Sequence, residues 1–323
     1  MEEGDDSRCW DELIPDALGL IFSNLSLQEI LTVVPRVCKS WGKAVKGPYC
    51  WQEIDIEEWS RRCRPEHLDR MLQMLIMRSC GSLRKLCVYG LPNDPIFSFI
   101  ADHAGSLQTL LMPRSEISDS IVEQVAGRLS TITFLDVSYC GKIGGRALEA
   151  IGKHCKLLMG LQRIMHPLKV GDKISQDDEA HAIATTMPKL KHLEMAYLLI
   201  TTGGVLEILS NCRELKFLDV RGCWDVKFDE KFLKEKYSGL KVLGPLVVDC
   251  YERNDWDDCS DYSDSSGYAW EFFACEMGDF DEVSSDGVYG VWDDEQTLEE
   301  LELRFYDQFD DDDDAGFDWP PSP

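Results

Sequence analysis

The stretch Ile132–Cys140 reads ITFLDVSYC, and the stretch Leu215–Cys223 reads LKFLDVRGC. Both carry apolar residues at their first, fourth and sixth positions, and a third copy of the pattern, LRKLCVYG, begins at Leu83. Apolar residues two positions apart, as at the fourth and sixth positions, are typical of a β-strand that buries one face. The three stretches therefore predict short strands of one recurring kind.

The pattern recurs at a nearly constant period. Weaker copies begin at Leu107, Leu190 and Leu240, and an early copy begins at Trp51. The starts at 83, 107 and 132, and again at 190, 215 and 240, are 24 or 25 residues apart. The intervening stretches space their apolar residues by three and four, as amphipathic helices do. One strand and one helix in about 20 to 29 residues is typical of leucine-rich repeats, so the sequence predicts a short α/β solenoid.

The period fails in one place. Between Leu158 and Met187 no copy keeps the spacing, and we expect a degenerate strand near Leu161 or Ile164. The loop HPLKVGDKISQDDEA, residues 166–180, is expected to follow this strand and to interrupt the stack.

Length and composition are those of a globular chain in a reducing compartment. The 323 residues, of which 44% are hydrophobic, suffice for a sizeable core without disulfides or metals. The chain begins with the acidic MEEGDDSRCW, unlike a signal peptide, and no apolar run approaches the roughly 18 residues of a membrane span. The thirteen cysteines form no CxxC pair, and we expect Cys140 and Cys223 to be buried turn residues rather than metal ligands or nucleophiles. These features predict the nucleus or the cytoplasm as the location.

The net charge of −26 is concentrated at one end. Residues 249–323 hold 26 of the 59 acidic residues and 2 of the 33 basic ones, so the rest of the chain is nearly neutral. Neither part has the basic stripe that nucleic-acid binding needs. Aromatic residues recur among the acids of this tail, which we expect to be largely disordered and either to solubilise the chain or to fold on binding.

The N-terminal part predicts three short helices over residues 10–56. In IPDALGLIFSNL, residues 14–25, a proline at the first helical turn precedes apolar residues that share one helical face. A second helix follows from Leu27 and is expected to break at Pro35, after which a third helix carries another apolar stripe. So small a module buries a modest fraction of its surface, so we expect a partner protein to supply the missing burial.

Residues 11–54 resemble an F-box in the Leu-Ile-Pro opening, the Ile-Phe pair, the Val-Cys-x-x-Trp element and the closing Trp-x-x-Ile. Together with the repeats, they make the chain similar to plant F-box proteins that carry leucine-rich repeats. The resemblance implies the substrate-recognition subunit of an SCF-type ubiquitin ligase, which binds a Skp-type adaptor and, through it, a cullin. The implied domains are a flexible N-terminus at 1–9, the F-box at 10–56, the repeats at 57–248 and the acidic tail at 249–323.

The family pattern implies adaptor contacts, some of which must also form the core of the module. The positions that match it are Pro15, Leu18, Ile21, Phe22, Leu25, Val37, Cys38 and Trp41.

The repeat strands predict a second interaction surface. Residues between the inward-facing apolar positions point to the concave face, where a rigid mixture of aromatic, charged and polar side chains suits protein recognition. For any single residue, a merely solvated strand face is the alternative. The candidate target-binding residues are Lys85, Tyr89, Phe134, Asp136, His192, Glu194, Phe217, Asp219 and Arg221, with Cys87 and Ser138 beside them.

Other classes of protein fit the sequence less well. Four Trp-Asp dipeptides occur, but without a Gly-His pair or the four strands of a propeller blade they do not predict a WD-40 propeller. Phosphate-binding glycine loops, GxSxG and HExxH are absent from the sequence, so we expect no catalysis, no cofactor and no metal. Two alternatives remain open: a scaffold that binds the adaptor without causing degradation, and a ligand-dependent co-receptor.

Overall fold

The computed structural model describes residues 10, 13–165, 175–228, 236–237 and 239–246. The predicted flexible N-terminus at 1–9, the predicted acidic tail at 249–323 and much of the predicted interrupting loop lie outside these residues.

The repeat strands form one parallel sheet whose order follows the sequence. Its strands are β1 (Glu53–Asp55), β2 (Lys85–Cys87), β3 (Thr109–Leu111), β4 (Phe134–Asp136), β5 (Gly160–Gln162), β6 (His192–Glu194), β7 (Phe217–Asp219) and β8 (Lys241–Leu243). The middle residues of neighbouring strands lie opposite one another, from Leu86 through Leu161 to Leu218, and these leucines are fully buried. The predicted α/β repeats are confirmed, and the degenerate strand is β5, at Leu161.

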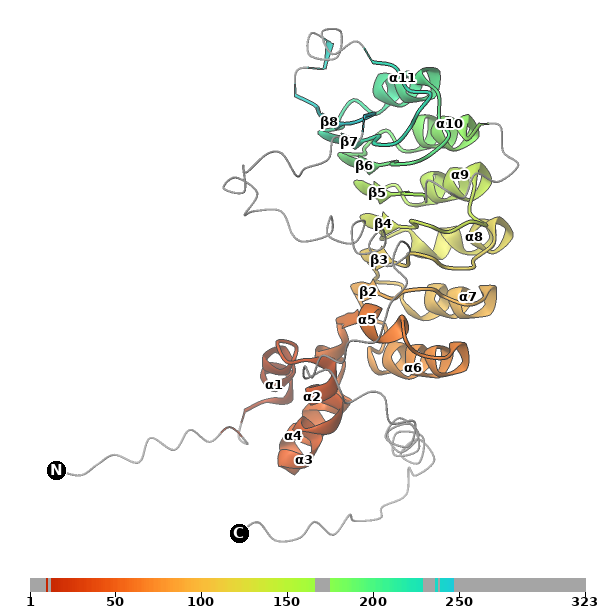
Figure 1. Cartoon of the computed structure of the whole chain (residues 1–323). Coiled ribbons are helices and arrows are strands. Elements are labelled where there is room, and N and C mark those ends of the chain that lie inside the picture. The colour runs from red at the N-terminus through yellow and green to blue at the C-terminus, as the bar shows by residue number, and fades with distance from the viewer. Residues whose placement is uncertain (1–9, 11–12, 166–174, 229–235, 238, 247–323) are drawn as a thin grey trace, which may run out of the picture. The chain divides into compact units, whose positions relative to one another are not determined.

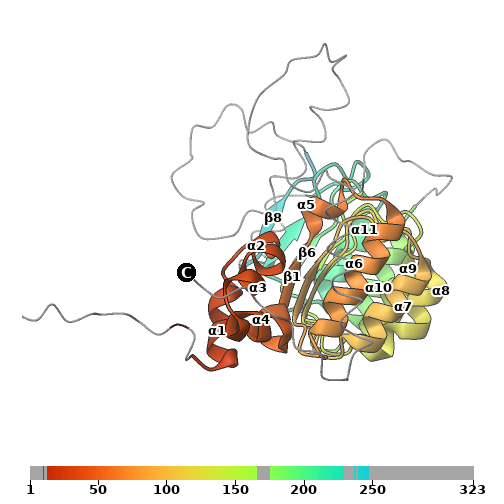
Figure 2. The same cartoon turned by 90° about the horizontal axis from the view of Figure 1, so that it is seen from below.

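Helices pack along one side of this sheet, as both views show (Figure 1; Figure 2). They are α6 (Pro65–Arg78), α7 (Asp94–His103), α8 (Asp119–Val125), the 3₁₀ turn η3 (Ala126–Leu129), α9 (Gly145–His154), α10 (Asp177–Thr186) and α11 (Thr202–Asn211). The short helix α5 (Glu57–Ser60) lies outside this row, as Figure 2 shows. Three helices of the row begin with side-chain caps, because Asn93, Ser118 and Thr201 each accept a bond from the backbone N–H three residues later. The caps therefore fix the residue at which each of these three helices begins.

One inward-facing position is charged in a single repeat and uncharged at the equivalent place of the other repeats that the structure describes. The residue two positions after the buried leucine is apolar in most repeats, as in Val88 and Val220, but it is Arg163 in the repeat of β5. Arg163 is 1% exposed, and its Nε donates to Oε2 of the equally buried Glu179 at 2.9 Å. The arginine and glutamate thus lie on opposite sides of the irregular segment.

Arg163 also satisfies backbone carbonyls of the preceding repeat. Its Nη1 donates to the carbonyl oxygens of Val137 and Cys140 at 3.3 and 3.1 Å, and its Nη2 donates to that of Ile143 at 2.7 Å. Because a buried charge is tolerated only when it is paired and hydrogen-bonded, this network keeps Arg163 inside the solenoid. It links the repeat before the irregular segment to α10 after it.

The predicted burial of the turn cysteines is confirmed. The thiols of Cys140 and Cys223 donate to the carbonyl oxygens of Met112 and Met195, in the preceding repeats, at 3.4 and 3.1 Å. Burial raises the pKa of both thiols to about 12, so they are neutral at pH 7. Their role here is to connect neighbouring repeats.

The N-terminal module differs from the predicted three helices. It consists of α1 (Pro15–Phe22), α2 (Leu27–Thr32), α3 (Val34–Val37), α4 (Lys39–Lys46) and the 3₁₀ turn η2 (Pro48–Trp51). The break falls before Pro35, which lies in the first turn of α3, where a proline needs no N–H donor. A second break at Cys38, whose backbone is extended with φ −158°, separates α3 from α4 and gives four helices.

The predicted boundary after residue 56 passes through continuous structure. Strand β1 precedes that boundary, yet it pairs in parallel with β2 of the first repeat. Trp51 is completely buried and donates through its Nε1 to the carbonyl oxygen of Val45 at 2.8 Å, and its ring lies 5.8 Å from the guanidinium carbon of Arg78 in α6. The end of the module is therefore also the start of the repeat sheet. In the described part of the chain, none of the helices has the length and apolar character needed to span a bilayer.

Candidate interaction surfaces

The core of the N-terminal module takes up part of the predicted adaptor-binding stripe. Leu18 and Phe22 are 0% and 2% exposed, and the ring of Phe22 lies 5.0 Å from that of Trp41. Leu18 and Phe22 are thus among the positions expected to form the core of the module, and whether they also contact an adaptor stays a prediction. Their side chains stabilise the module and position its outer surface.

The remaining predicted positions stand at or near the surface. Ile21, Leu25 and Val37 are 42%, 39% and 55% exposed, and Pro15 is exposed too. Cys38 and Trp41 are half-buried. Whether these residues contact an adaptor stays a prediction.

Sequence reasoning missed four exposed apolar residues of this module. Leu13, Ile14, Leu20 and Val33 lie outside the predicted stripe and are 37%, 65%, 56% and 55% exposed. Over the described residues, eight of the thirteen large apolar side chains that are exposed belong to residues 10–37, so they concentrate on this module. We call one set of them the apolar surface: Leu13, Ile14, Leu20, Ile21, Leu25, Val33 and Val37.

The strand face of the repeats carries two rows of side chains. The first residue of each strand supplies one row and the third residue supplies the other, because side chains alternate along a strand and the middle residue is buried. The first row from β2 to β8 is Lys85, Thr109, Phe134, Gly160, His192, Phe217 and Lys241. The third row is Cys87, Leu111, Asp136, Gln162, Glu194, Asp219 and Leu243.

Aromatic rings follow one another along the first row. The rings of His192 and Phe217 stack with centroids 4.5 Å apart and an interplanar angle of 10°, and Phe134 lies 6.2 Å from His192. Phe134 reaches across β5 because Gly160 leaves room: a Cβ there would lie 2.3 Å from its Cδ2 atom. We call Phe134, His192 and Phe217 the aromatic ladder.

Three carboxylates lie in the part of the third row beside this ladder: Asp136, Glu194 and Asp219. Glu194 accepts a bond from Gln162 Nε2 at 2.9 Å, and its Oε1 lies 2.6 Å from Nε2 of His192. Burial raises the pKa of Asp136 to about 6, although its bonds from Ser138 act in the opposite direction. Glu194 and Glu57 raise it further, so Asp136 lies among negative charges.

Asp219 differs from the other predicted target-binding residues, because it is completely buried. Both of its oxygens accept bonds from Nε of Arg221 at 3.0 Å, and Nη2 of Arg221 adds a bond of 2.6 Å. Asp219 therefore holds Arg221 in place, and whether it also contacts a target stays a prediction.

Aromatic and arginine side chains lie at and beside the point where the strands end. We call them the rim: Arg61, Tyr89, Arg114, Tyr139, Tyr197 and Arg221. The backbone is left-handed at the same point of several repeats, with φ between 57° and 60° at Arg114, Tyr139 and Tyr197. Residues other than glycine rarely adopt this conformation, and glycine occupies the same point in two other repeats, at Gly90 and Gly222. The guanidinium of Arg114 lies 5.2 Å from the ring of Tyr139, and that of Arg61 lies 4.6 Å from the ring of Tyr89. Only Tyr89 and Arg221 of this rim were predicted.

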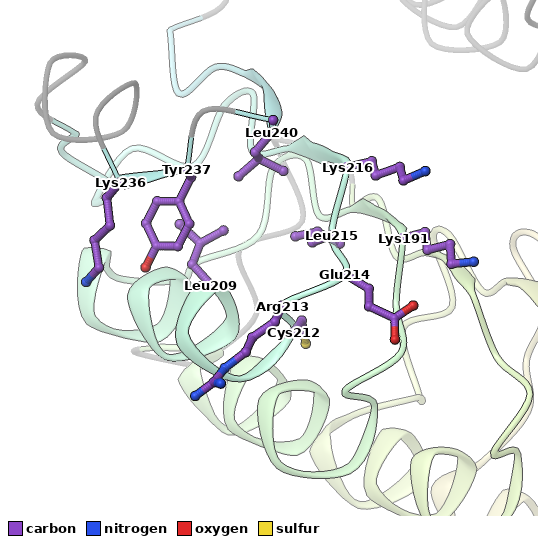
Figure 3. A pocket seen from close by; sticks show the side chains of 11 residues that line it. Lys191, Leu209, Cys212, Arg213, Glu214, Leu215, Lys216, Lys236, Tyr237 and Leu240 are labelled. Carbon is purple, nitrogen blue, oxygen red and sulfur yellow. The ribbon is translucent and has the colours of Figure 1, made fainter.

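A cavity of about 700 Å³ adjoins α11, β7 and β8 (Figure 3). Among the described residues that line it, the basic ones are Lys191, Arg213, Lys216 and Lys236, and the acidic one is Glu214. Burial raises the pKa of its one thiol, Cys212, to about 11, so this thiol is not a nucleophile at neutral pH. The described residues also contain no group of three or more His, Cys, Asp or Glu side chains able to hold a metal ion.

A helical module with an apolar surface, joined to parallel strand-and-helix repeats, defines the class of F-box proteins with leucine-rich repeats. The family model of the F-box domain matches residues 10–53. The F-box protein FBW2 of Arabidopsis thaliana is 60% identical to this chain over 328 residues, which cover 100% of both proteins. The chain therefore belongs to the plant F-box proteins.

More distant relatives from Arabidopsis thaliana agree with this assignment. F-box protein SKIP1 is 32% identical over 75% of this chain and 87% of its own length. Putative F-box/LRR-repeat protein 23 is 30% identical over 78% of this chain and 55% of its own length. A solved structure, that of the Rad7 and Elc1 complex in yeast, matches 53% of this chain and 44% of its own at 17% identity, and its TM-score of 0.41 is too low to carry an argument.

Proposed function

We propose that this chain is the substrate-recognition subunit of an SCF-type E3 ubiquitin ligase. Its F-box binds a Skp-type adaptor and, through it, a cullin, while its repeats bind a target protein that is then ubiquitinated and degraded. The chain itself holds the target and leaves the chemistry to other subunits, as is typical of F-box proteins. We place it in the nucleus or the cytoplasm, a location that its free cysteines support.

The apolar surface of the F-box is the observation that carries this proposal. Its residues are 37% to 65% exposed, although the same module completely buries Leu18 and Trp51. Fully burying one such side chain stabilises by roughly 1.5–3 kcal/mol. Burial of several against an adaptor supplies a substantial part of the roughly 8 kcal/mol that corresponds to micromolar affinity.

The direct test measures binding of the full chain to a purified Skp-type adaptor. We expect Ile21→Asp combined with Val37→Asp to weaken binding at least a hundredfold, because both substitutions place charges in an apolar interface. The matched control combines Met77→Asp with Leu157→Asp, two substitutions at similarly exposed residues of the repeats. Equal binding by the two double variants would contradict the assignment of this interface.

A second measurement separates the ligase subunit from a non-degradative scaffold. Proteins that co-purify with the repeats should have longer half-lives in cells that carry the Ile21→Asp, Val37→Asp variant than in cells with the unchanged chain. A scaffold would leave those half-lives equal.

A further inference from the structure

The charges of the strand face are unevenly matched. Asp219 is neutralised by Arg221 at 2.6 Å, and Glu57 in α5 is paired with Arg61 at 2.7 Å. Within the described ranges, Asp136 has no ion pair, and the only one at Glu194 is with His192, which requires a protonated ring. Arg221 also acts electrostatically on Glu194, but its ion pair is with Asp219. Because neither Asp136 nor Glu194 is ion-paired with a lysine or arginine within these ranges, the middle of the strand face keeps an excess of negative charge.

The two carboxylates flank a neutral strand. Asp136 lies on β4 and Glu194 on β6, with Gln162 of β5 between them. Neighbouring strands are about 4.8 Å apart, so the backbones of β4 and β6, with β5 between them, are separated by about 10 Å. Gln162 donates to Glu194 and thereby turns that carboxylate toward the intervening strand.

The aromatic ladder runs alongside these carboxylates. Phe134 and His192 occupy the first positions of the two strands that carry Asp136 and Glu194. Between them Gly160 has no side chain, and the ring of Phe134 lies above it. A ligand that reaches the carboxylates at this point therefore also meets an aromatic surface.

We propose that this part of the strand face recognises an arginine-containing segment of the target protein, whose guanidinium binds Asp136 and Glu194 and whose side chain stacks on Phe134 and His192. The inference rests on the proposed function, in which the repeats bind the target, and it adds the chemistry of the recognised segment.

Arginine fits this surface better than other side chains do. A guanidinium is planar, stacks on aromatic rings and donates in parallel pairs to carboxylates. An acidic or phosphorylated segment would be repelled by Asp136 and Glu194. Lysine would satisfy the charge, but its ammonium offers no plane for stacking and no fork for paired bonds.

The environment of Asp136 gives independent support. Burial and the nearby Glu194 and Glu57 make its charge unfavourable in the free protein. A bound cation removes that penalty, so part of the binding energy comes from relief of repulsion already present in the fold.

The experiment selects peptides from a random twelve-residue display library on the full chain. We expect arginine to be enriched among the bound peptides, and replacement of that arginine by the neutral analogue citrulline to weaken binding at least tenfold. Selection of peptides without any enrichment of arginine, or with an enrichment of acidic residues, would overturn the proposal.

Variants then locate the binding site, which matters because the acidic tail also attracts basic peptides. Asp136→Asn with Glu194→Gln keeps the shapes of both side chains and is expected to remove the arginine preference. The control, Glu149→Gln with Glu207→Gln, removes the same charge from α9 and α11 and should leave it unchanged. Equal loss in both variants, or in neither, would overturn the proposal. Phe134→Leu should weaken binding about two- to fivefold.

Adaptor binding by the same variants separates the two proposals. If Asp136→Asn with Glu194→Gln binds the Skp-type adaptor normally but the unchanged chain shows no arginine preference, this inference alone fails. If the unchanged chain binds no adaptor, the proposed function fails whatever peptides it selects.

Discussion

The F-box and the repeats expose different chemistry. The F-box leaves isoleucine, leucine and valine side chains at its surface, whereas the strand face presents carboxylates, aromatic rings and arginines. The same difference holds inside, because the F-box core is apolar around Leu18 and the repeats bury the Arg163–Glu179 ion pair. An apolar surface binds mainly through the apolar area that is buried against a partner, which suits one constant partner. Charged groups, in contrast, distinguish among partners by the charges that they match. The contrast suggests that the two binding events can be changed separately.

The largest expected effect tests the buried charge in the repeats. Arg163→Met restores the apolar residue of the other repeats but leaves Glu179 buried without its cation, so the free energy of unfolding should fall by about 3–5 kcal/mol. Adding Glu179→Met should recover part of this loss, because the unpaired charge disappears. Denaturant unfolding of the full chain measures both. A single variant as stable as the unchanged protein would show that the pair contributes nothing to the fold.

The next prediction separates core from surface within α1. Leu18→Ala should destabilise the F-box by about 2–5 kcal/mol, because it leaves a cavity beside Phe22. Ile21→Ala, in the same helix, should leave the melting temperature nearly unchanged and weaken only adaptor binding. Thermal unfolding and adaptor binding of each variant provide the comparison. If Ile21→Ala lowered the melting temperature more than Leu18→Ala does, α1 would pack its other face against the core.

Salt should distinguish the two surfaces. Raising ionic strength from about 0.05 to 0.5 M shortens the Debye length, so arginine-peptide binding to the strand face should weaken about tenfold. Adaptor binding through the apolar surface should change less than threefold over the same range. Titrations of the full chain at several salt concentrations measure both affinities. Parallel salt dependence would remove the distinction between the surfaces.

The smallest expected effect concerns pH. The pKa of Asp136 is raised from 3.8 to about 6, so the folded chain binds more protons than the unfolded chain between these values. Stability conferred through this group should therefore fall as pH rises from about 4 to 6. Asp136→Asn should remove this component and unfold at a slightly higher temperature at pH 7 than the unchanged chain. Melting curves at several pH values provide the test.

The repeats were predictable because a nearly constant period of 24 or 25 residues identifies most of their strands. The irregular strand at Leu161 could be placed because repeats were recognised on both sides of it. Face assignment in the F-box was harder, since helical spacing shows that Leu18, Ile21 and Phe22 lie near one another but not which of them meet the module's own core. The left-handed backbone at Tyr139 and Tyr197 was not predicted, although glycines at the equivalent positions of two other repeats, Gly90 and Gly222, are a signal for it. Arg163 also left a signal: a charge at a position that is apolar in most other repeats.

The thiols that join neighbouring repeats also have an experimental consequence. Cys140, Cys155, Cys212 and Cys223 each donate to a carbonyl oxygen earlier in the stack, and each is sealed from solvent. An alkylating reagent reaches such a sulfur only when its junction opens. The order in which these cysteines are modified in native protein would therefore reveal where the solenoid begins to come apart.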